Sequence, residues 1–235
     1  MVSFVRHFFP ELPSTQSFLR GWASQAALPE GTLVWTLRQT EGYGRKGTPW
    51  YATPGESLTF SFFLRPRCSL DTLTPRAALA LYDAIAPYTQ KPLFLKWPND
   101  LWCPQGKLAG ILTEVVWDSP TPQAFIGIGL NVYQKSFPPG LPAASLSQVG
   151  NPPPHLSALL DDFEQAFQRW YEAPDTQARH TFLMRLERKG RFSIQGQTYE
   201  GELYEWHPEK GLCLSTPHGK LWVSPGHLHM LWPSS

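Results

Sequence analysis

The sequence contains few cysteines, and none of them forms a pair typical of metal or redox centres. Cys68, Cys103 and Cys213 lie far apart in a chain of 235 residues, and no Cys-x-x-Cys motif occurs. An odd number of widely spaced cysteines disfavours a disulfide framework. We therefore expect a reducing compartment, the cytoplasm.

Long apolar runs and an excess of one charge are also missing. No run of 18 apolar residues occurs, and the N-terminal segment is too short and interrupted for a signal peptide, so no membrane association is predicted. Lys and Arg number 20 against 19 Asp and Glu, a formal net charge of +1. Proteins that bind nucleic acids generally carry a basic excess, so DNA is disfavoured as a partner.

The sequence lacks the usual motifs of covalent and metal catalysis. No Gly-x-Ser-x-Gly, His-Glu-x-x-His or nucleophilic cysteine motif is present. His227 and His229 would share one face of a strand, but no third ligand follows at a recognisable spacing, so a surface strand is favoured and no metal site is predicted. The usable groups are cations, glycines and amides, which stabilise developing negative charge.

Residues up to about 189 mix helical and strand patterns. Apolar residues at helical spacing predict helices at 14–27, with Ser14 as the cap, and at 74–88, 156–170 and 176–188. Alternation predicts strands at 32–39, 58–64, 93–97, 109–117 and 125–132, and a proline-rich loop spans 137–154. This mixture indicates an α/β or α+β architecture.

The pattern changes near Gly190. Short strands separated by turns are predicted at 192–194, 199–206, 212–215 and 221–223. A β unit of this size is near the lower limit for independent stability. We therefore expect a main domain of residues 1–189 with a small β domain, residues 190–235, docked on it.

The loop at 39–50 holds Gly42, Gly44 and Gly47 close together, with Arg45 and Lys46 between them. Glycines allow backbone N–H groups to approach a ligand, and the two cations add charged donors. This combination suits a phosphate or a carboxylate. The alternative is a mobile surface hairpin with a solvated basic tip.

Two lysine-containing segments follow. In Lys-Trp-Pro-Asn-Asp, Pro98 ends a strand and gathers Lys96, Asn99 and Asp100 at the strand end, where ligand sites often lie, although such a turn is common. Lys107 precedes an apolar strand, and a partly buried ammonium needs an anionic partner. That partner is a substrate carboxylate or phosphate, unless Lys107 forms a structural ion pair or extends to solvent.

The segment Gly-Ile-Gly-Leu-Asn at 127–131 places glycines in a predicted strand. Strand glycines indicate that another molecule packs closely, and the amide of Asn131 suits the edge of a nucleobase. A β-bulge explains the glycines equally well.

Taken in order, the four blocks Gln39–Trp50, Lys96–Asp100, Lys107–Glu114 and Gly127–Asn131 resemble those of biotin–protein ligases, also called biotin–[acetyl-CoA-carboxylase] ligases. The segment Ser14-Thr15-Gln16 is similar to an early Ser-Thr-Asn segment of that family, and the resemblance covers about residues 10–190. It implies an α+β, class II synthetase-like catalytic domain with a mixed sheet flanked by helices. The β tail is similar to the family's small SH3-like barrel.

The resemblance also implies a two-step reaction. ATP, accompanied by Mg²⁺, activates the carboxylate of the substrate biotin as biotinyl-5′-AMP. A lysine of a biotin carboxyl carrier protein, such as an acetyl-CoA carboxylase subunit, then takes the biotin. Helix-turn-helix DNA binding, found in bifunctional members, is not expected, and we expect a monomer or a homodimer.

Site residues are carried over by position. The resemblance implies Lys107 and Arg45 as catalytic residues. Biotin-binding positions are Ser14, Thr15, Gln16, Gln39, Tyr43, Gly44, Arg45 and Lys107, and nucleotide-binding positions are Trp50, Lys96, Asn99 and Asn131. The chain departs from the family pattern where Tyr43 and Thr48 replace loop arginines and Gln16 replaces an asparagine.

Two alternatives stay open. A lipoyl or octanoyl ligase or transferase shares the expected architecture and acyl chemistry. A non-catalytic biotin-responsive binding protein would keep the pocket but would not need a lysine at position 107.

Overall fold

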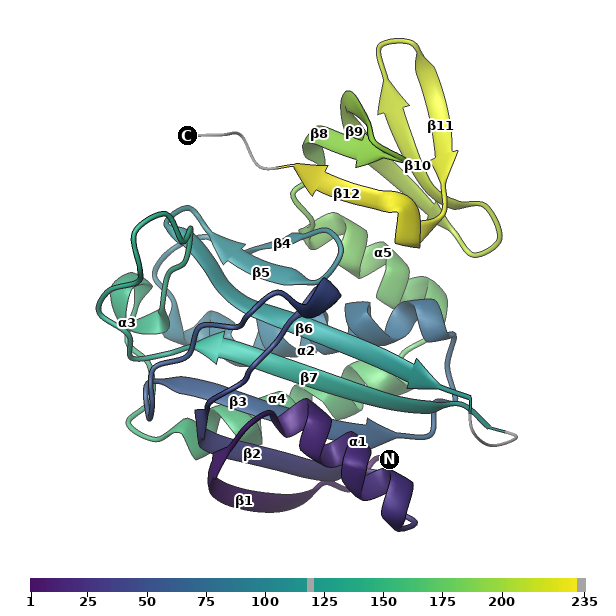
Figure 1. The fold of residues 1–235 in the computed structure, drawn as a ribbon. Helices are drawn as coiled ribbons and strands as arrows, with labels where there is room; N and C mark the ends of the chain where they lie inside the picture. The colour runs from purple at the N-terminus through teal and green to yellow at the C-terminus, as the bar shows by residue number, and fades with distance from the viewer. Residues whose placement is uncertain (118–120, 232–235) are drawn as a thin grey trace.

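A computed structural model describes residues 1–117 and 121–231, which form a seven-stranded mixed sheet and a five-stranded antiparallel sheet (Figure 1). The first sheet has the order β1 (Val5–Leu12), β2 (Thr32–Gln39), β3 (Ser57–Leu64), β7 (Gln123–Asn131), β6 (Gly106–Val116), β5 (Asp100–Cys103) and β4 (Phe94–Lys96). Only β1 and β2 pair in parallel; the other neighbours are antiparallel.

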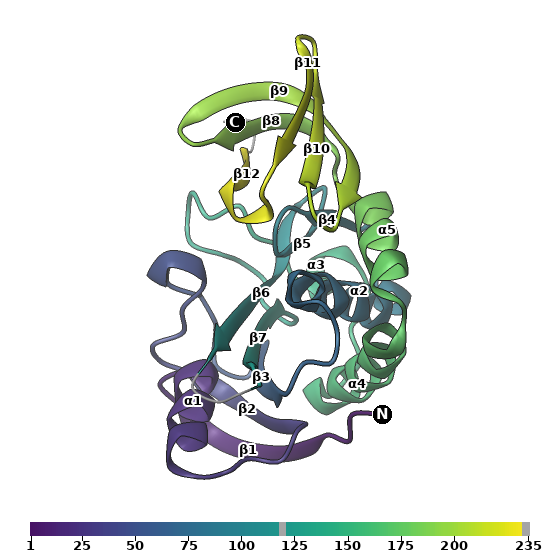
Figure 2. The same ribbon diagram turned by 90° about the vertical axis from the view of Figure 1, so that its right-hand side faces the viewer.

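Helices cover both faces of the large sheet. Their bounds are α1 (Thr15–Gln25), α2 (Leu73–Ile85), α3 (Leu146–Val149), α4 (Leu156–Glu172) and α5 (Asp175–Arg185). Figure 2 shows α2, α4 and α5 on one side of the sheet and α1 on the other, beside the loop that follows β2. The mixed sheet flanked by helices is the predicted architecture, which is thereby confirmed.

The interior strand β3 shows why both faces of the sheet are covered, since every one of its residues is buried. Phe60 and Phe62 pack against Phe163 and Phe167 of α4, with ring centroids 4.9–5.8 Å apart for three of these pairs. Ser61, between them, faces the opposite side and is 2.9 Å from the Thr15 hydroxyl. Alternation along a strand sends successive side chains to opposite faces, so the larger core lies under α2 and α4. The α1 side carries a smaller apolar cluster, which includes Leu19 and Phe63, beside polar groups such as Ser61.

Most predicted elements are present. Ser14 caps α1 and its hydroxyl accepts from the Ser17 N–H at 3.3 Å. The helix expected from position 74 begins at Leu73, and Pro75 lies within its first turn. Two strands were not predicted: β1, an edge strand that contains Pro10, and β5, whose first residue had been placed in the Pro-Asn-Asp turn.

The second sheet has the order β11 (Gly219–Val223), β10 (Gly211–Thr216), β9 (Gln197–His207), β8 (Lys189–Ile194) and β12 (Leu228–Leu231). The predicted small C-terminal β unit is therefore confirmed. The surface strand favoured at His227 and His229 is β12, which contains His229 and pairs with β8, whereas His227 lies in the 3₁₀ turn before it. In residues 189–231, β11 and β12 are the sheet's two edges, so closure into a barrel stays a prediction. The division into two domains also stays a prediction, because the two sheets share one apolar core.

The Trp97 side chain joins the second sheet to the first. Trp97 directly follows β4 and is 5 % exposed. Its indole N–H donates to the Leu228 carbonyl of β12 at 3.0 Å, and its ring meets Trp206 of β9 edge-on at 5.4 Å. The β4–β5 turn is therefore held by β9 and β12.

Two further observations concern the cysteines and the helices. All three cysteines are free thiols. Within residues 1–117 and 121–231, no helix combines the length and the apolar character needed to cross a bilayer.

We predict that Trp97→Phe destabilises the protein. The substitution removes the indole donor, leaves the Leu228 carbonyl without its partner and opens space beside Trp206. A lost buried hydrogen bond of this kind costs about 1–3 kcal/mol, and each kcal/mol lowers the Tm by about 2–4 °C in a protein of this size. Thermal and urea unfolding measure the effect.

Trp222→Phe is the matched control, since Trp222 on β11 is 41 % exposed. It should change the free energy of unfolding by less than about 0.5 kcal/mol. Equal stability of the two variants would contradict the proposed role of Trp97.

Candidate functional site

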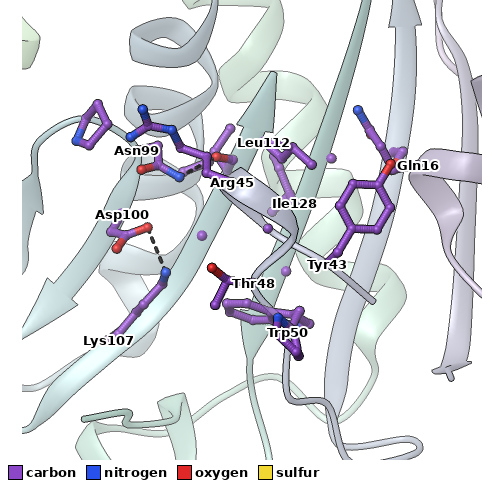
Figure 3. Close-up of a pocket in the computed structure, with 18 of the residues that line it drawn as sticks. Gln16, Tyr43, Arg45, Thr48, Trp50, Asn99, Asp100, Lys107, Leu112 and Ile128 are labelled. Carbon is purple, nitrogen blue, oxygen red and sulfur yellow. Dashed lines mark hydrogen bonds and ion pairs between the residues drawn. The ribbon is translucent and has the colours of Figure 1, made fainter. Parts of the chain in front are cut away.

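A cavity of about 310 Å³ opens on the α1 side of the large sheet (Figure 3). This volume lies within the range of small-molecule sites, about 300–1,000 Å³. Of the twelve predicted site residues, eleven line it: Ser14, Thr15, Gln16, Gln39, Tyr43, Gly44, Arg45, Trp50, Lys96, Asn99 and Lys107. Segments far apart in the sequence therefore meet at one site.

One end of the cavity is lined with neutral polar groups from the start of α1. The Thr15 N–H and hydroxyl both reach the Gln39 Oε1, at 2.9 and 3.2 Å. Gln16 is buried and its Nε2 donates to the Glu114 carboxylate at 2.9 Å and to the Phe125 carbonyl at 3.1 Å. Thr15 occupies the side-chain oxygen of Gln39, so Gln39 has its NH₂ group left to donate to a ligand. In Gln16 the NH₂ group is occupied, so its side-chain oxygen is left to accept.

The strand glycines make room for the protein's own side chains. A Cβ at Gly127 would lie 2.7 Å from the Gln16 Oε1, and one at Gly129 would lie 2.4 Å from the Trp50 indole. The sequence predicts that another molecule packs closely against these glycines. In the structure the close neighbours are Gln16 and Trp50, which themselves line the cavity.

The glycine-rich loop is a closed hairpin rather than an open cradle. Tyr43 pairs with Pro49, and a short 3₁₀ turn, η1 (Arg45–Gly47), forms its tip. The Gly44 N–H donates to the Thr48 carbonyl at 2.7 Å, and the Gly47 N–H to the Gly44 carbonyl at 3.3 Å. These two N–H groups are thus used within the loop, so Gly44 and Gly47 do not provide the backbone donors that the sequence predicts for an anion.

The other end of the cavity is cationic. Figure 3 shows Arg45, Asn99, Asp100 and Lys107 on one side of the cavity, with Gln16 and Tyr43 on the other. Three cations, Arg45, Lys96 and Lys107, face a single carboxylate, Asp100. In the described part of the chain Arg45 forms no ion pair, so this end favours a ligand with more than one negative charge.

Lys107 has a fixed backbone and an ion-paired side chain. Its N–H donates to the Pro142 carbonyl and its carbonyl accepts from the Ala144 N–H, both at 2.9 Å. Its Nζ lies 2.8 Å from the Asp100 Oδ1 and 5.5 Å from the centre of the Trp50 ring. A structural ion pair was one of the alternatives for Lys107; it is present, and it lies inside the cavity.

Asp100 and Lys96 face each other across the β4–β5 hairpin. The Lys96 Nζ lies 4.4 Å from the centre of the Trp102 ring. Burial lowers the pKa of Lys96 below its ordinary value, and Lys107 adds to this, while Asp100 opposes it. Asn99 lines the cavity, and its Nδ2 donates to the Ile111 carbonyl at 2.7 Å, which fixes the turn on β6.

Asn131 is the predicted site residue that does not line the cavity. It is buried, and its Nδ2 donates to the carbonyls of Lys107 and Ala144 at 3.2 and 3.1 Å. Its Oδ1 accepts from Gln134 at 3.2 Å. The amide that we expected to meet a nucleobase instead holds the backbone of Lys107.

Several lining residues were not predicted. Ser61 comes from β3, and His229 and Met230 come from β12 of the second sheet. Burial lowers the pKa of His229, as do the nearby charges of Lys46 and Arg45. The local sequence carries no signal for these contacts, since β12 reaches the cavity only through its pairing with β8. Asp100 was noted at the strand end but was not assigned a role.

Comparison with known proteins agrees with this geometry. Residues 8–131 match the model of the biotin/lipoate A/B protein ligase family. A biotin–[acetyl-CoA-carboxylase] ligase of Mycobacterium tuberculosis is 32 % identical over 227 residues, which cover 91 % of this chain and 84 % of that protein. A ligase of the same name from Paracoccus denitrificans is 35 % identical over 213 residues, covering 80 % and 86 %.

Comparison with solved structures also finds a biotin protein ligase, and this match extends over nearly the whole chain. The biotin protein ligase of Aquifex aeolicus in complex with biotin and ATP superposes with a TM-score of 0.78 and 25 % identity. The match covers 96 % of this chain and 98 % of that one, so it includes both sheets. From its sequence match and its fold, the chain belongs to the biotin/lipoate A/B protein ligase family.

Proposed function

We propose that this protein is an ATP-dependent biotin–protein ligase. In the first step a carboxylate oxygen of biotin attacks the α-phosphorus of ATP, the bond to the β-phosphate breaks, and pyrophosphate leaves. In the second step a lysine amine of a biotin carboxyl carrier protein attacks the acyl carbon, AMP leaves, and the amine loses a proton. The relatives from M. tuberculosis and P. denitrificans, named as ligases of acetyl-CoA carboxylase, support a carrier of this type.

The observation that carries this proposal is the polarity of the cavity. Its neutral end offers both an acceptor on Gln16 and a donor on Gln39, which complements a cyclic urea with N–H and C=O groups. Its cationic end suits a carboxylate and phosphates. In biotinyl-5′-AMP the ureido ring lies at one end of the biotin part and the acyl phosphate at the other. The ring thus matches the neutral end of the cavity and the acyl phosphate matches the cationic end.

The roles of individual residues are those that the family resemblance implies, and the place of these residues in one cavity supports them. Ser14, Thr15, Gln16 and Gln39 bind the ureido ring, and Tyr43 and Gly44 cover it. Lys107 holds the biotin carboxylate and then the acyl phosphate, which Arg45 also contacts. Trp50, Lys96 and Asn99 lie on the nucleotide side. We assign Asn131 to holding the Lys107 backbone, since its amide is already bonded there.

ATP enters as its magnesium complex, with the metal bound mostly through phosphate oxygens. No nucleophilic side chain is needed, because adenylation gives the acyl group a good leaving group that the carrier amine displaces directly. That amine must be deprotonated, so the second step accelerates as the pH rises towards a lysine pKa of about 10.4. A cytoplasmic site of action is consistent with the three free cysteines.

The proposed reaction can be tested directly. The protein should catalyse ATP–pyrophosphate exchange that depends on biotin, and it should add one biotin to a biotin carrier domain, as seen by mass spectrometry. A carrier whose acceptor lysine is changed to arginine should gain none.

Lipoate in place of biotin tests the alternative substrate class. Exchange driven by lipoate but not by biotin would replace the proposal with a lipoyl ligase. Biotin binding without any exchange would instead indicate a binding protein.

Lys107→Ala should slow biotinyl-AMP formation by about 10²–10³, because the transition state loses a charged donor aimed at the reacting oxygens. Pyrophosphate release at saturating biotin and ATP measures this rate, and circular dichroism checks the fold. Lys91→Ala is the matched control, since Lys91 is exposed and does not line the cavity. Wild-type pyrophosphate release from Lys107→Ala would exclude the assigned role.

Arg45→Ala should release biotinyl-AMP faster. Arg45 forms no ion pair in the described residues, so its contact with the ligand is what would anchor the η1 loop. Escaped intermediate labels nearby lysines, so biotin on an added bystander protein should increase on a streptavidin blot. Arg38→Ala, which removes an exposed cation paired with Glu11, should leave the blot at the wild-type level. An unchanged blot for Arg45→Ala, with carrier labelling intact, would contradict the retention role.

A further inference from the structure

The amide of Gln16 is fixed in one orientation. Its two N–H donors are both used, by the Glu114 Oε2 at 2.9 Å and by the Phe125 carbonyl at 3.1 Å. An ionised carboxylate and a carbonyl can only accept hydrogen bonds, so a rotated amide would place its oxygen against two acceptors. Glu114 and Phe125 lie directly opposite each other on β6 and β7, which places both acceptors side by side.

The fixed orientation leaves the Gln16 Oε1 without a donor. This atom is buried and accepts no hydrogen bond from the described residues, while Gln16 as a whole is 3 % exposed and lines the cavity. Gly127 leaves the space beside it open, because any Cβ there would lie 2.7 Å from the oxygen. A buried carbonyl without a partner is costly, so the structure carries an acceptor that a ligand N–H can satisfy.

Glu114 is itself held in place. Its other oxygen, Oε1, lies 3.1 Å from the Arg20 Nη1, and Arg20 is one helical turn beyond Gln16 on α1. One carboxylate thus binds two residues of the same helix through separate oxygens. Glu114 does not line the cavity, so it acts on a ligand only through Gln16.

We propose that Glu114 is a positioning residue that keeps the Gln16 Oε1 directed at the cavity as the acceptor for a ureido N–H of biotin. The inference rests on the proposed function and adds a basis for selecting biotin over lipoate. The cyclic urea of biotin supplies an N–H donor to the Gln16 Oε1, whereas the dithiolane ring of lipoate has no such donor and leaves this oxygen unsatisfied.

Glu114→Gln tests the proposal with almost no change in side-chain size. A glutamine at 114 can present either its oxygen or its NH₂ to Gln16, so both orientations of the Gln16 amide become possible. We expect the KM for biotin to rise about tenfold in ATP–pyrophosphate exchange, which is about 1.4 kcal/mol. The kcat and the KM for ATP should stay within about twofold of the wild type, since the cationic end is untouched.

Arg20→Ala separates positioning from a purely structural role. It removes the half-exposed ion pair with Glu114 but leaves the Gln16–Glu114 hydrogen bond. The KM for biotin should therefore stay near the wild-type value. A rise equal to that of Glu114→Gln would show that the ion pair, not the amide orientation, matters, and would overturn the proposal.

Biotin methylated on one or the other ureido nitrogen provides a test that needs no variant. Calorimetry without ATP should show at least one of the two methylated compounds binding the wild type at least about tenfold more weakly than biotin. This preference should shrink in Glu114→Gln. Equal binding of biotin and both methylated forms, or an unchanged biotin KM in Glu114→Gln, would overturn the proposal while leaving the ligase function intact. A wild-type protein that binds no biotin at all would overturn the proposed function itself.

Discussion

The seven-stranded sheet is covered on both faces, and this constraint governs where the site can lie. On one face, Phe60 and Phe62 of β3 pack into the core with α4, so this face is closed to ligands. On the other face, Ser61 and the strand glycines take up little space, and Gln16 and Trp50 occupy part of the room they leave. The remaining space is the cavity. Its existence depends on small residues alternating with large ones along β3 and β7.

Electrostatics divides this cavity into two chemically different ends. At the neutral end, the neighbours of Gln16 and Gln39 fix the orientation of both side-chain amides. Gln16 donates to two acceptors and so offers its oxygen to a ligand, whereas Gln39 accepts from Thr15 and so offers its NH₂ group. At the other end, Lys96 and Lys107 are gathered around Asp100, and Arg45 extends from a separate loop. A ligand that carries an uncharged polar ring and a negatively charged group satisfies both ends at once. Neither end alone would distinguish biotin from other small acids.

The second sheet takes part in the site through the β4–β5 hairpin. Trp97 fixes this hairpin to β12 by a hydrogen bond and to β9 by a ring contact. The same strand β12 brings His229 and Met230 to the rim of the cavity. Because the turn that carries Asn99 and Asp100 lies between the two sheets, the geometry of the cationic end depends on both.

The sequence by itself determined the elements that depend on local patterns, and its motifs identified many of the residues that line the cavity. The Ser14 cap, the alternation of β3 and the turn at Pro98 are local signals. The four motif blocks, together with the segment Ser14-Thr15-Gln16, pointed to eleven of the lining residues. Only the tertiary structure decided the rest. Pairing with β2 makes Val5–Leu12 a strand although it contains a proline, and pairing with β8 brings His229 to the cavity. The direction of the Asn131 amide and the hold of Glu114 on Gln16 likewise depend on partners distant in the sequence. Such contacts form between residues that sheet register and helix packing bring together, so they cannot be predicted from the pattern of neighbouring residues in the sequence.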